Sequence, residues 1–118
     1  MYDDRVCELQ LTYGRGGQEP KLRPVATRLK DRRAAARVLV RIDRLAAGNP
    51  GDVRPVGNGV SELRIDYGPG YRVYYLQDGD RLILLLCGGN KASQDGDVLA
   101  AKRIAQQWKE AKDDEQRT

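Results

Sequence analysis

Alternating apolar and polar residues between Ser61 and Cys87 predict three antiparallel strands. In "SELRIDY" (61–67) and "YRVYYL" (71–76) every second residue is apolar, which is the period of a strand with one buried face. The third segment, 81–87, contains the unbroken run "LILLL", which indicates burial on both faces and a place inside the sheet. Asp78-Gly79 is a tight-turn signal before that segment. The pattern therefore predicts a three-stranded meander.

Two segments of helical periodicity flank the meander. The first runs from about Lys30 to Ala47 and is stopped by Gly48-Asn49. Its apolar stripe consists of Ala35, Val38, Leu39, Ile42, Leu45 and Ala46. The second runs from about Asp95 to Lys112, and its stripe consists of Val98, Ala101, Ile104, Ala105 and Trp108, with Trp108 expected in the core. Both stripes are wide enough to pack on a sheet.

The remaining segments complete an α+β prediction. Val6–Thr12 has the pattern of an additional N-terminal strand, whereas the segments "YGRGGQEPKLRP" and "GNPGDVRPVGNG" read as loops because of their glycines and prolines. The 118 residues suit one domain, with an atypical N-terminal segment at 1–29 and a flexible tail at 113–118. We expect a curved antiparallel sheet that packs with an N-terminal helical segment and a C-terminal helix.

The pairing of the first two strands decides what lies on the second face of the sheet. A turn centred near Pro69 pairs Ile65 with Val73 and Leu63 with Tyr75 on the apolar face. The other face then carries Arg64, Asp66, Arg72 and Tyr74, with Asp66 across from Arg72 and Arg64 across from Tyr74. Two interpretations are open: a solvated ion pair beside a stacked Arg–Tyr pair, or, with Lys91, a phosphate-binding surface that offers an aromatic ring to a base.

Composition removes several classes of catalyst. The chain has no histidine, which excludes a Ser-His-Asp triad, a Cys-His pair and every zinc site that needs imidazole. Two cysteines, Cys7 and Cys87, are too few for a metal cluster; buried thiols are favoured, and a disulfide between them stays open. The longest apolar run is too short for a membrane span and no signal segment opens the chain, so we expect a soluble cytoplasmic protein.

Positive charge is concentrated around the first helix. The formal net charge is +4, and residues 21–44 hold nine of the basic side chains against Asp31 and Asp43. Such a series is either a solvated helix face or a surface that attracts RNA without regard to its sequence. The helical members of the series are Arg32, Arg33, Arg37, Arg41 and Arg44.

The motifs "GVSELRIDYGPGYRVYY" and "LLCGGNKASQ" carry a family resemblance that extends over Lys30 to Ala105. They resemble the addiction-module killer proteins, which are HigB-like toxins of the RelE/ParE superfamily. The resemblance implies a RelE-like fold and a ribosome-dependent mRNA endonuclease without cofactor or metal. It also implies a co-expressed antitoxin, for which we expect a small helix-turn-helix DNA-binding protein. The expected partners are therefore this antitoxin, the ribosome and mRNA, and no membrane.

The resemblance also implies residue roles for a reaction in which the RNA 2′-OH attacks the neighbouring phosphate. Arg72 matches the phosphate-stabilising strand arginine, Arg64 would bind an adjacent phosphate, and Lys91 matches the basic position after the last strand. Proton transfer falls to Lys91, Asp97, a tyrosine or a ribosomal group. Gln94 and Tyr74 would contact RNA, and the arginine series would dock onto the ribosome.

The chain departs from the family pattern at three places. The usual "GGDKSSQ" reads "GGNKASQ", Gly96 stands where lysine is common, and Met1 to Arg28 has no Trp-Leu helix motif. Two alternatives therefore stay open: a non-enzymatic inhibitor of DNA gyrase like the ParE branch, and a toxin that retains only antitoxin binding. Arg64, Arg72 and Lys91 together favour the endonuclease.

Overall fold

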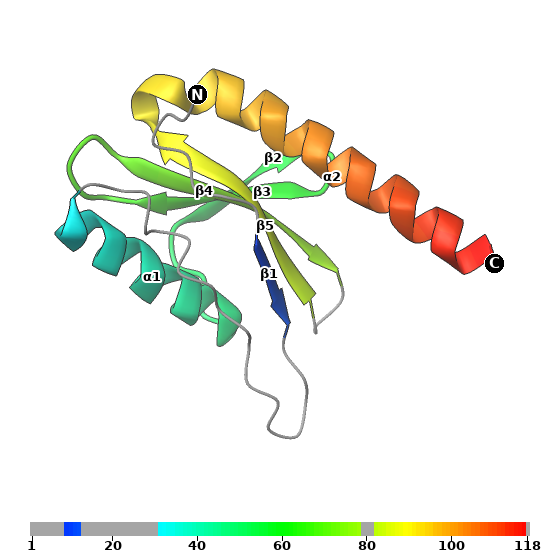
Figure 1. Ribbon diagram of the computed structural model, residues 1–118. Helices are drawn as coiled ribbons and strands as arrows, with labels where there is room; N and C mark the ends of the chain where they lie inside the picture. The colour runs from blue at the N-terminus through cyan, green and yellow to red at the C-terminus, as the bar shows by residue number, and fades with distance from the viewer. Residues whose placement is uncertain (1–8, 13–30, 79–81, 118) are drawn as a thin grey trace.

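The computed structural model describes residues 9–12, 31–78 and 82–117 and shows a five-stranded antiparallel sheet between two helices (Figure 1). The strands are β1 (Leu9–Thr12), β2 (Val53–Gly57), β3 (Val60–Ile65), β4 (Tyr71–Asp78) and β5 (Leu82–Asn90). Their order in the sheet is β1-β5-β4-β3-β2. The helices are α1 (Arg32–Ala46), the short 3₁₀ helix η2 (Lys91–Ser93) and α2 (Gln94–Arg117). The predicted α+β class, the meander and the inner position of the "LILLL" strand are confirmed.

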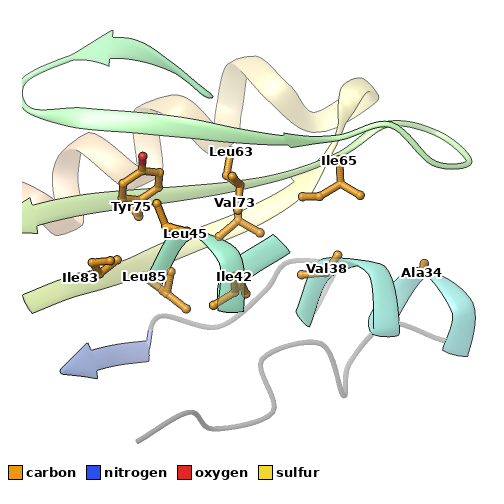
Figure 2. Close-up of a cluster of buried hydrophobic side chains, with 10 residues drawn as sticks. All are labelled: Ala34, Val38, Ile42, Leu45, Leu63, Ile65, Val73, Tyr75, Ile83 and Leu85. Atoms are coloured by element: carbon orange, nitrogen blue, oxygen red, sulfur yellow. The ribbon is translucent and has the colours of Figure 1, made fainter. Parts of the chain in front are cut away.

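Each face of the sheet buries its own hydrophobic cluster under one helix. Figure 2 shows the cluster beneath α1, where Val38 and Ile42 of the helix meet Leu63, Val73 and Leu85 of the sheet. On the other face, Ala101 and Ala105 of α2 pack against Tyr74, Leu84 and Leu86, with Trp108 at the margin. Residues 83–86 of β5 supply both clusters in alternation, because successive side chains of a strand point to opposite faces.

Helix α1 is capped at both ends, and its C-terminal stop is the one predicted from the sequence. The Asp31 carboxylate accepts hydrogen bonds from the backbone N–H groups of Arg33 and Ala34 at the N-terminus. At the other end, Gly48 N–H donates to Leu45 O and Asn49 N–H to Arg44 O, with Gly48 at φ +88°. Two such bonds around a left-handed residue form a Schellman cap, which glycine adopts without strain.

Strand β2 was not expected, because "GNPGDVRPVGNG" reads as a loop. The segment pairs with β3, and it lies at the edge of the sheet. Pro55 is compatible with that place, since an edge strand needs ladder hydrogen bonds on one side only. The loop interpretation is therefore wrong for Val53–Gly57.

The register of the β3–β4 hairpin also differs from the prediction. Ile65 pairs with Tyr71 and Leu63 with Val73, so the hairpin is centred on Gly68 and not on Pro69. A shift of the centre by one residue moves every partner by two, which changes the pairs but leaves each side chain on its predicted face. Arg64 therefore lies opposite Arg72, and Tyr74 lies opposite Glu62.

Helix α2 is longer than predicted. It continues to Arg117 instead of ending near Lys112, and so includes most of the tail expected to be flexible. The segment "KEAKDDEQR" contains no glycine or proline and is rich in good helix formers, so nothing local stops the helix. Cys87 is buried, and its Sγ donates a hydrogen bond to Asp97 O at 3.4 Å. Val6, Cys7, Lys30 and Gly79 lie outside the described residues. None of the described helices has the length and apolar character needed to span a bilayer.

Candidate functional site

Polar side chains gather on the α2 face of the sheet in two neighbouring cross-strand rows. In the first row, Arg54 of β2 pairs with Glu62 of β3, and Glu62 pairs with Tyr74 of β4. In the second row, Arg64 of β3 pairs with Arg72 of β4. The first turn of α2 lies over these rows, because Gln94 reaches down to Glu62. The site is thus assembled from three strands and a helix N-terminus.

Glu62 lies at the centre of this group and is fully buried. Its Oε2 accepts hydrogen bonds from Tyr74 Oη at 2.9 Å and from Gln94 Nε2 at 3.0 Å. Arg72 Nε lies 3.6 Å from the same oxygen. The Nε atoms of Arg64 and Arg54 lie 3.9 Å and 4.0 Å from Oε1. We call these six residues the Glu62 cluster: Glu62, Arg54, Arg64, Arg72, Tyr74 and Gln94.

Two buried atoms of the Glu62 cluster lack hydrogen bonds. Within the described part of the chain, neither Glu62 Oε1 nor Arg72 Nε has a partner at hydrogen-bond distance. A buried polar atom without a partner costs about 1–3 kcal/mol of stability, or more when it is charged. Such atoms are rare in folded proteins, and a binding or catalytic role is one reason for retaining them. The cluster is therefore a candidate for function as well as for structure.

Tyr74 serves the cluster as a neutral hydrogen-bond donor. Burial raises the pKa of Tyr74 far above its usual value, and the hydrogen bond to Glu62 and the negative charges of Glu62 and Asp97 raise it further. The contact of Tyr74 with RNA stays a prediction; in this structure the residue is fully buried, so its ring is not accessible to a base. The predicted Arg64–Tyr74 pair is wrong, since Arg64 faces Arg72 across the strands.

Arg72 is buried and has a different partner from the one expected. The sequence paired it with Asp66 on a solvated face, whereas Asp66 is exposed and Glu62 is the carboxylate next to Arg72. The other end of its guanidinium donates from Nη1 to Gly70 O at 3.1 Å. A Cβ at Gly70 would lie 3.6 Å from Arg72 Nη1 and 3.7 Å from Lys91 Cβ. Arg72 and the base of the exposed Lys91 side chain are therefore neighbours.

Asp97 lies in the first turn of α2, next to the end of β5, and is buried instead of facing solvent. Its carboxylate is buried, and Oδ2 accepts a hydrogen bond from Ser93 Oγ at 2.5 Å. Asn90 caps η2 by accepting from the N–H groups of Ala92 and Ser93, so an amide in place of the usual acid still supplies the cap. The role of Asp97 in proton transfer to RNA stays a prediction, and its burial does not favour that role. The neighbour of Asp97 across the corner between β5 and α2 is Gly89, where a Cβ would collide with Asp97 and Ser93.

The arginines of α1 do not act as one surface. Arg41 Nη1 donates to Arg64 O, and Arg41 Nη2 donates to Pro50 O at 2.8 Å, so Arg41 fastens α1 to the loop before β2 and to β3. Arg37 lies over the Tyr67 ring, 4.7 Å from its centroid. The side chains of Arg32, Arg33, Arg37 and Arg44 are exposed. They stand on the helix that covers the opposite face of the sheet from the Glu62 cluster (Figure 1).

The structure thus brings Arg64, Arg72, Lys91 and Gln94 to one end of the sheet and leaves the α1 arginines elsewhere. An arrangement of guanidinium and ammonium groups of this kind binds anions, phosphate above all. Among the described residues, no group of three or more cysteines and carboxylates is placed to hold a metal ion.

Two residues of the site were missed in the sequence. Glu62 has the same strand alternation as Arg64, and this parity alone could have placed it on the site face. Glu62 is buried because α2 packs over this part of the sheet, and the alternation of residues along β3 gives no sign of that packing. Arg54 was missed because its strand was read as a loop.

Comparison with known proteins supports the relationship seen in the motifs. The family described as "Phage derived protein Gp49-like" matches residues 28–110. A Haemophilus influenzae protein named "Uncharacterized protein" is 49% identical over 81 residues, which is 69% of this chain and 82% of that relative. No solved structure matches the chain. Because the match covers most of the chain and all of the site, the chain belongs to the Gp49-like family of phage-derived proteins, a family of RelE/HigB-type toxins.

Proposed function

We propose that this protein is the HigB-like toxin of a type II toxin–antitoxin system and that it cleaves mRNA on the ribosome. The observation that carries the proposal is the juxtaposition of Arg64 and Arg72, directly opposite each other, with Lys91 beside Arg72. Like charges at opposed positions destabilise a sheet unless another charge or a ligand compensates for them. Glu62 compensates in part, and an RNA phosphate would compensate further.

The proposed reaction is attack of an RNA 2′-OH on the adjacent phosphate, with the 5′-oxygen of the next nucleotide as leaving group. Arg64 and Lys91 bind the backbone and orient the two reacting oxygens, which is the main need of such a reaction. The guanidinium of Arg72 stabilises the negative charge that develops on the phosphate. Tyr74 and Asp97 are buried, so we assign proton transfer to Lys91 or to a group of the ribosome.

Docking on the ribosome is assigned to the exposed arginines of α1. Arg32, Arg33, Arg37 and Arg44 would provide attraction to ribosomal RNA that depends on salt and not on sequence. Arg41 is left out of this surface, because its guanidinium is bonded to backbone carbonyls.

The proposed partner is a cognate antitoxin, a small helix-turn-helix protein encoded beside the toxin. Its co-expression should relieve growth arrest and raise the thermal stability of the toxin, since a ligand that binds only the folded state stabilises it. A protein that is harmless when expressed alone at high level would instead favour the alternative of a toxin that retains only antitoxin binding.

The test is cleavage of a translated mRNA by the purified protein, read by primer extension. Arg64→Ala and Lys91→Ala should each lose most of the cleavage, whereas Arg103→Ala, a change at an exposed arginine of α2, should not. Inhibition of DNA supercoiling by gyrase without any mRNA cleavage would replace the proposal by the gyrase-inhibitor alternative.

A further inference from the structure

Three arginines on three adjacent strands converge on one buried carboxylate. Arg54 of β2, Arg64 of β3 and Arg72 of β4 all have their nearest contact with Glu62 through Nε, at 4.0, 3.9 and 3.6 Å. Nε is the guanidinium nitrogen closest to the backbone. Each contact therefore leaves the terminal nitrogens for other acceptors, and the Nη1 atom of Arg72 donates to Gly70 O.

The three side chains form a gradient from the interior to the surface. The exposed fraction of the side chain is 8% for Arg72, 39% for Arg64 and 60% for Arg54, while Glu62 beneath them has none. Asp52 is a second carboxylate at this surface, with Oδ2 at 4.0 Å from Arg64 Nε and 63% of its side chain exposed. The side chains of Arg64 and Arg54 thus reach solvent, whereas Arg72 is nearly buried and Glu62 is fully buried.

We propose that Glu62 is a positioning residue that aligns Arg54, Arg64 and Arg72 as one binding group for the phosphodiester backbone of single-stranded RNA, and that Arg54 is a direct RNA contact. The inference rests on the proposed function and extends it by these two residues. Glu62 orients the guanidiniums by charge, and their outer N–H groups take the phosphates.

Two features of the geometry separate this role from others. Glu62 does not touch substrate, because it is buried and its Oε2 already accepts from Tyr74 and Gln94. A carboxylate placed for stability alone is expected to hold its arginines at hydrogen-bond distance, whereas Oε1 and Arg72 Nε have no such bond in the described residues. The contacts are those of a preassembled site whose outer acceptor is supplied by the ligand.

The first test measures the binding of a short single-stranded RNA to the full chain at several salt concentrations. Each phosphate neutralised on a single strand contributes about 0.7 to the slope of log K against log salt. Arg54→Ala should lower the slope by this amount, and Arg103→Ala on α2 serves as the matched control. Equal slopes for the Arg54→Ala and Arg103→Ala proteins would exclude Arg54 from the contact.

The second test asks whether Arg54 acts through Glu62, by a double-mutant cycle with Glu62→Gln. Positioning predicts that Arg54→Ala changes the slope by close to zero in the Glu62→Gln background. Simple electrostatics predicts an equal or larger change, because the guanidiniums lose a neutralising charge. Glu62→Asp retains the charge but places it farther from the arginines, so it should also weaken the coupling between positions 54 and 62. An unchanged effect of Arg54→Ala in either folded variant would overturn the role of Glu62.

Cleavage of translated mRNA gives the readout that connects this site to the proposed function. Glu62→Gln should lower kcat by about 100-fold at unchanged folded fraction, as small displacements of positioning groups do. A kcat equal to that of the parent protein would contradict the positioning role. Absence of cleavage by the parent itself would refute the proposed nuclease, while the RNA-binding cycle would still decide the role of Glu62.

Discussion

At the scale of single residues, the site is organised around the buried carboxylate of Glu62. A buried carboxylate is tolerated only with compensating charges and hydrogen bonds, and here three arginines, a tyrosine and a glutamine provide them. The interaction between Glu62 and Arg72 is the most deeply buried of these ion pairs. Replacement of either partner therefore acts on folding as well as on any reaction.

Arg72→Ala should lower the free energy of unfolding by about 3–5 kcal/mol, because it leaves Glu62 buried without its closest counter-charge. The sequence alone suggested an exposed pair and hence little loss of stability, an expectation that the burial of Arg72 overturns. Urea unfolding measures the change, and Asp66→Ala on the exposed turn should stay within about 0.5 kcal/mol of the parent. Equal stability of the Arg72→Ala protein would show that the ion pair is not closed in solution.

Tyr74 predicts a loss of stability in alkali. Burial raises its pKa above the usual value of 10.0, so the folded state keeps a proton that the unfolded chain releases. This stabilisation is complete below about pH 10 and declines as the pH rises further. Tyr74→Phe should lower stability near neutral pH by about 1.5–3 kcal/mol, through the lost bond to Glu62, and should flatten the alkaline decline. Burial also raises the pKa of Tyr75, which should account for the decline that remains. An undiminished alkaline slope in Tyr74→Phe would contradict the assignment.

At the scale of elements, the corner between β5 and α2 depends on the absence of a side chain at Gly89. The Asp97 carboxylate and Ser93 Oγ occupy the space that a Cβ would need. Their position sets the start of α2 and, through Gln94, the cover over Glu62.

Gly89→Ala should therefore destabilise the protein by several kcal/mol, since the Asp97 side chain is buried and has little room to move. Gly96→Ala in the first turn of α2 is the matched control, because nothing lies within 4 Å of the added Cβ. That change should raise stability by about 0.5–1 kcal/mol through helix propensity. Thermal unfolding of both variants tests the corner, and a Gly89→Ala protein as stable as the parent would show that the Asp97 corner opens freely.

Arg41 and Arg33 separate the structural from the binding part of the α1 arginine series. Arg41→Ala should cost about 1–2 kcal/mol, because its guanidinium donates to the carbonyls of Arg64 and Pro50. Arg33→Ala should leave stability within about 0.5 kcal/mol and should weaken ribosome binding at low salt. Chemical denaturation and sedimentation with ribosomes distinguish the two, and equal losses of stability would contradict the division.

The elements predicted correctly from the sequence are those in which the residues that the local pattern marks as buried are also buried in the fold. The 3.6-residue period of α1, its Gly48 stop and the run "LILLL" all belong to segments that bury the residues their pattern indicates. Val53–Gly57 was missed because Pro55 and Gly57 read as a loop, although one neighbouring strand is enough to hold them in the sheet. The hairpin register was missed because "YGPG" fixes the place of a turn only within a residue.

At the scale of the whole molecule, two positively charged regions lie on opposite faces of the sheet. The Glu62 cluster and Lys91 occupy the face under α2, and the exposed arginines of α1 lie on the other side (Figure 1). The sequence predicted Arg64, Arg72 and Lys91 of the first region and the arginines of the second. It did not predict Glu62 or Arg54, because strand alternation assigns a residue to a face without showing how deeply it is buried. The burial of these residues depends on how the helices pack on the sheet, and in the folded protein Glu62, Arg72, Tyr74 and Asp97 are all buried. A toxin with this charge distribution would use one face for chemistry and the other for docking.

The most direct test of this account is primer-extension mapping of one mRNA incubated with the purified protein, with and without ongoing translation. We predict new 5′ ends inside the reading frame only in the translated sample, and their loss with Arg64→Ala but not with Arg103→Ala. Efficient cutting of the naked transcript, or an Arg64→Ala protein that cuts at the parental rate, would contradict the account.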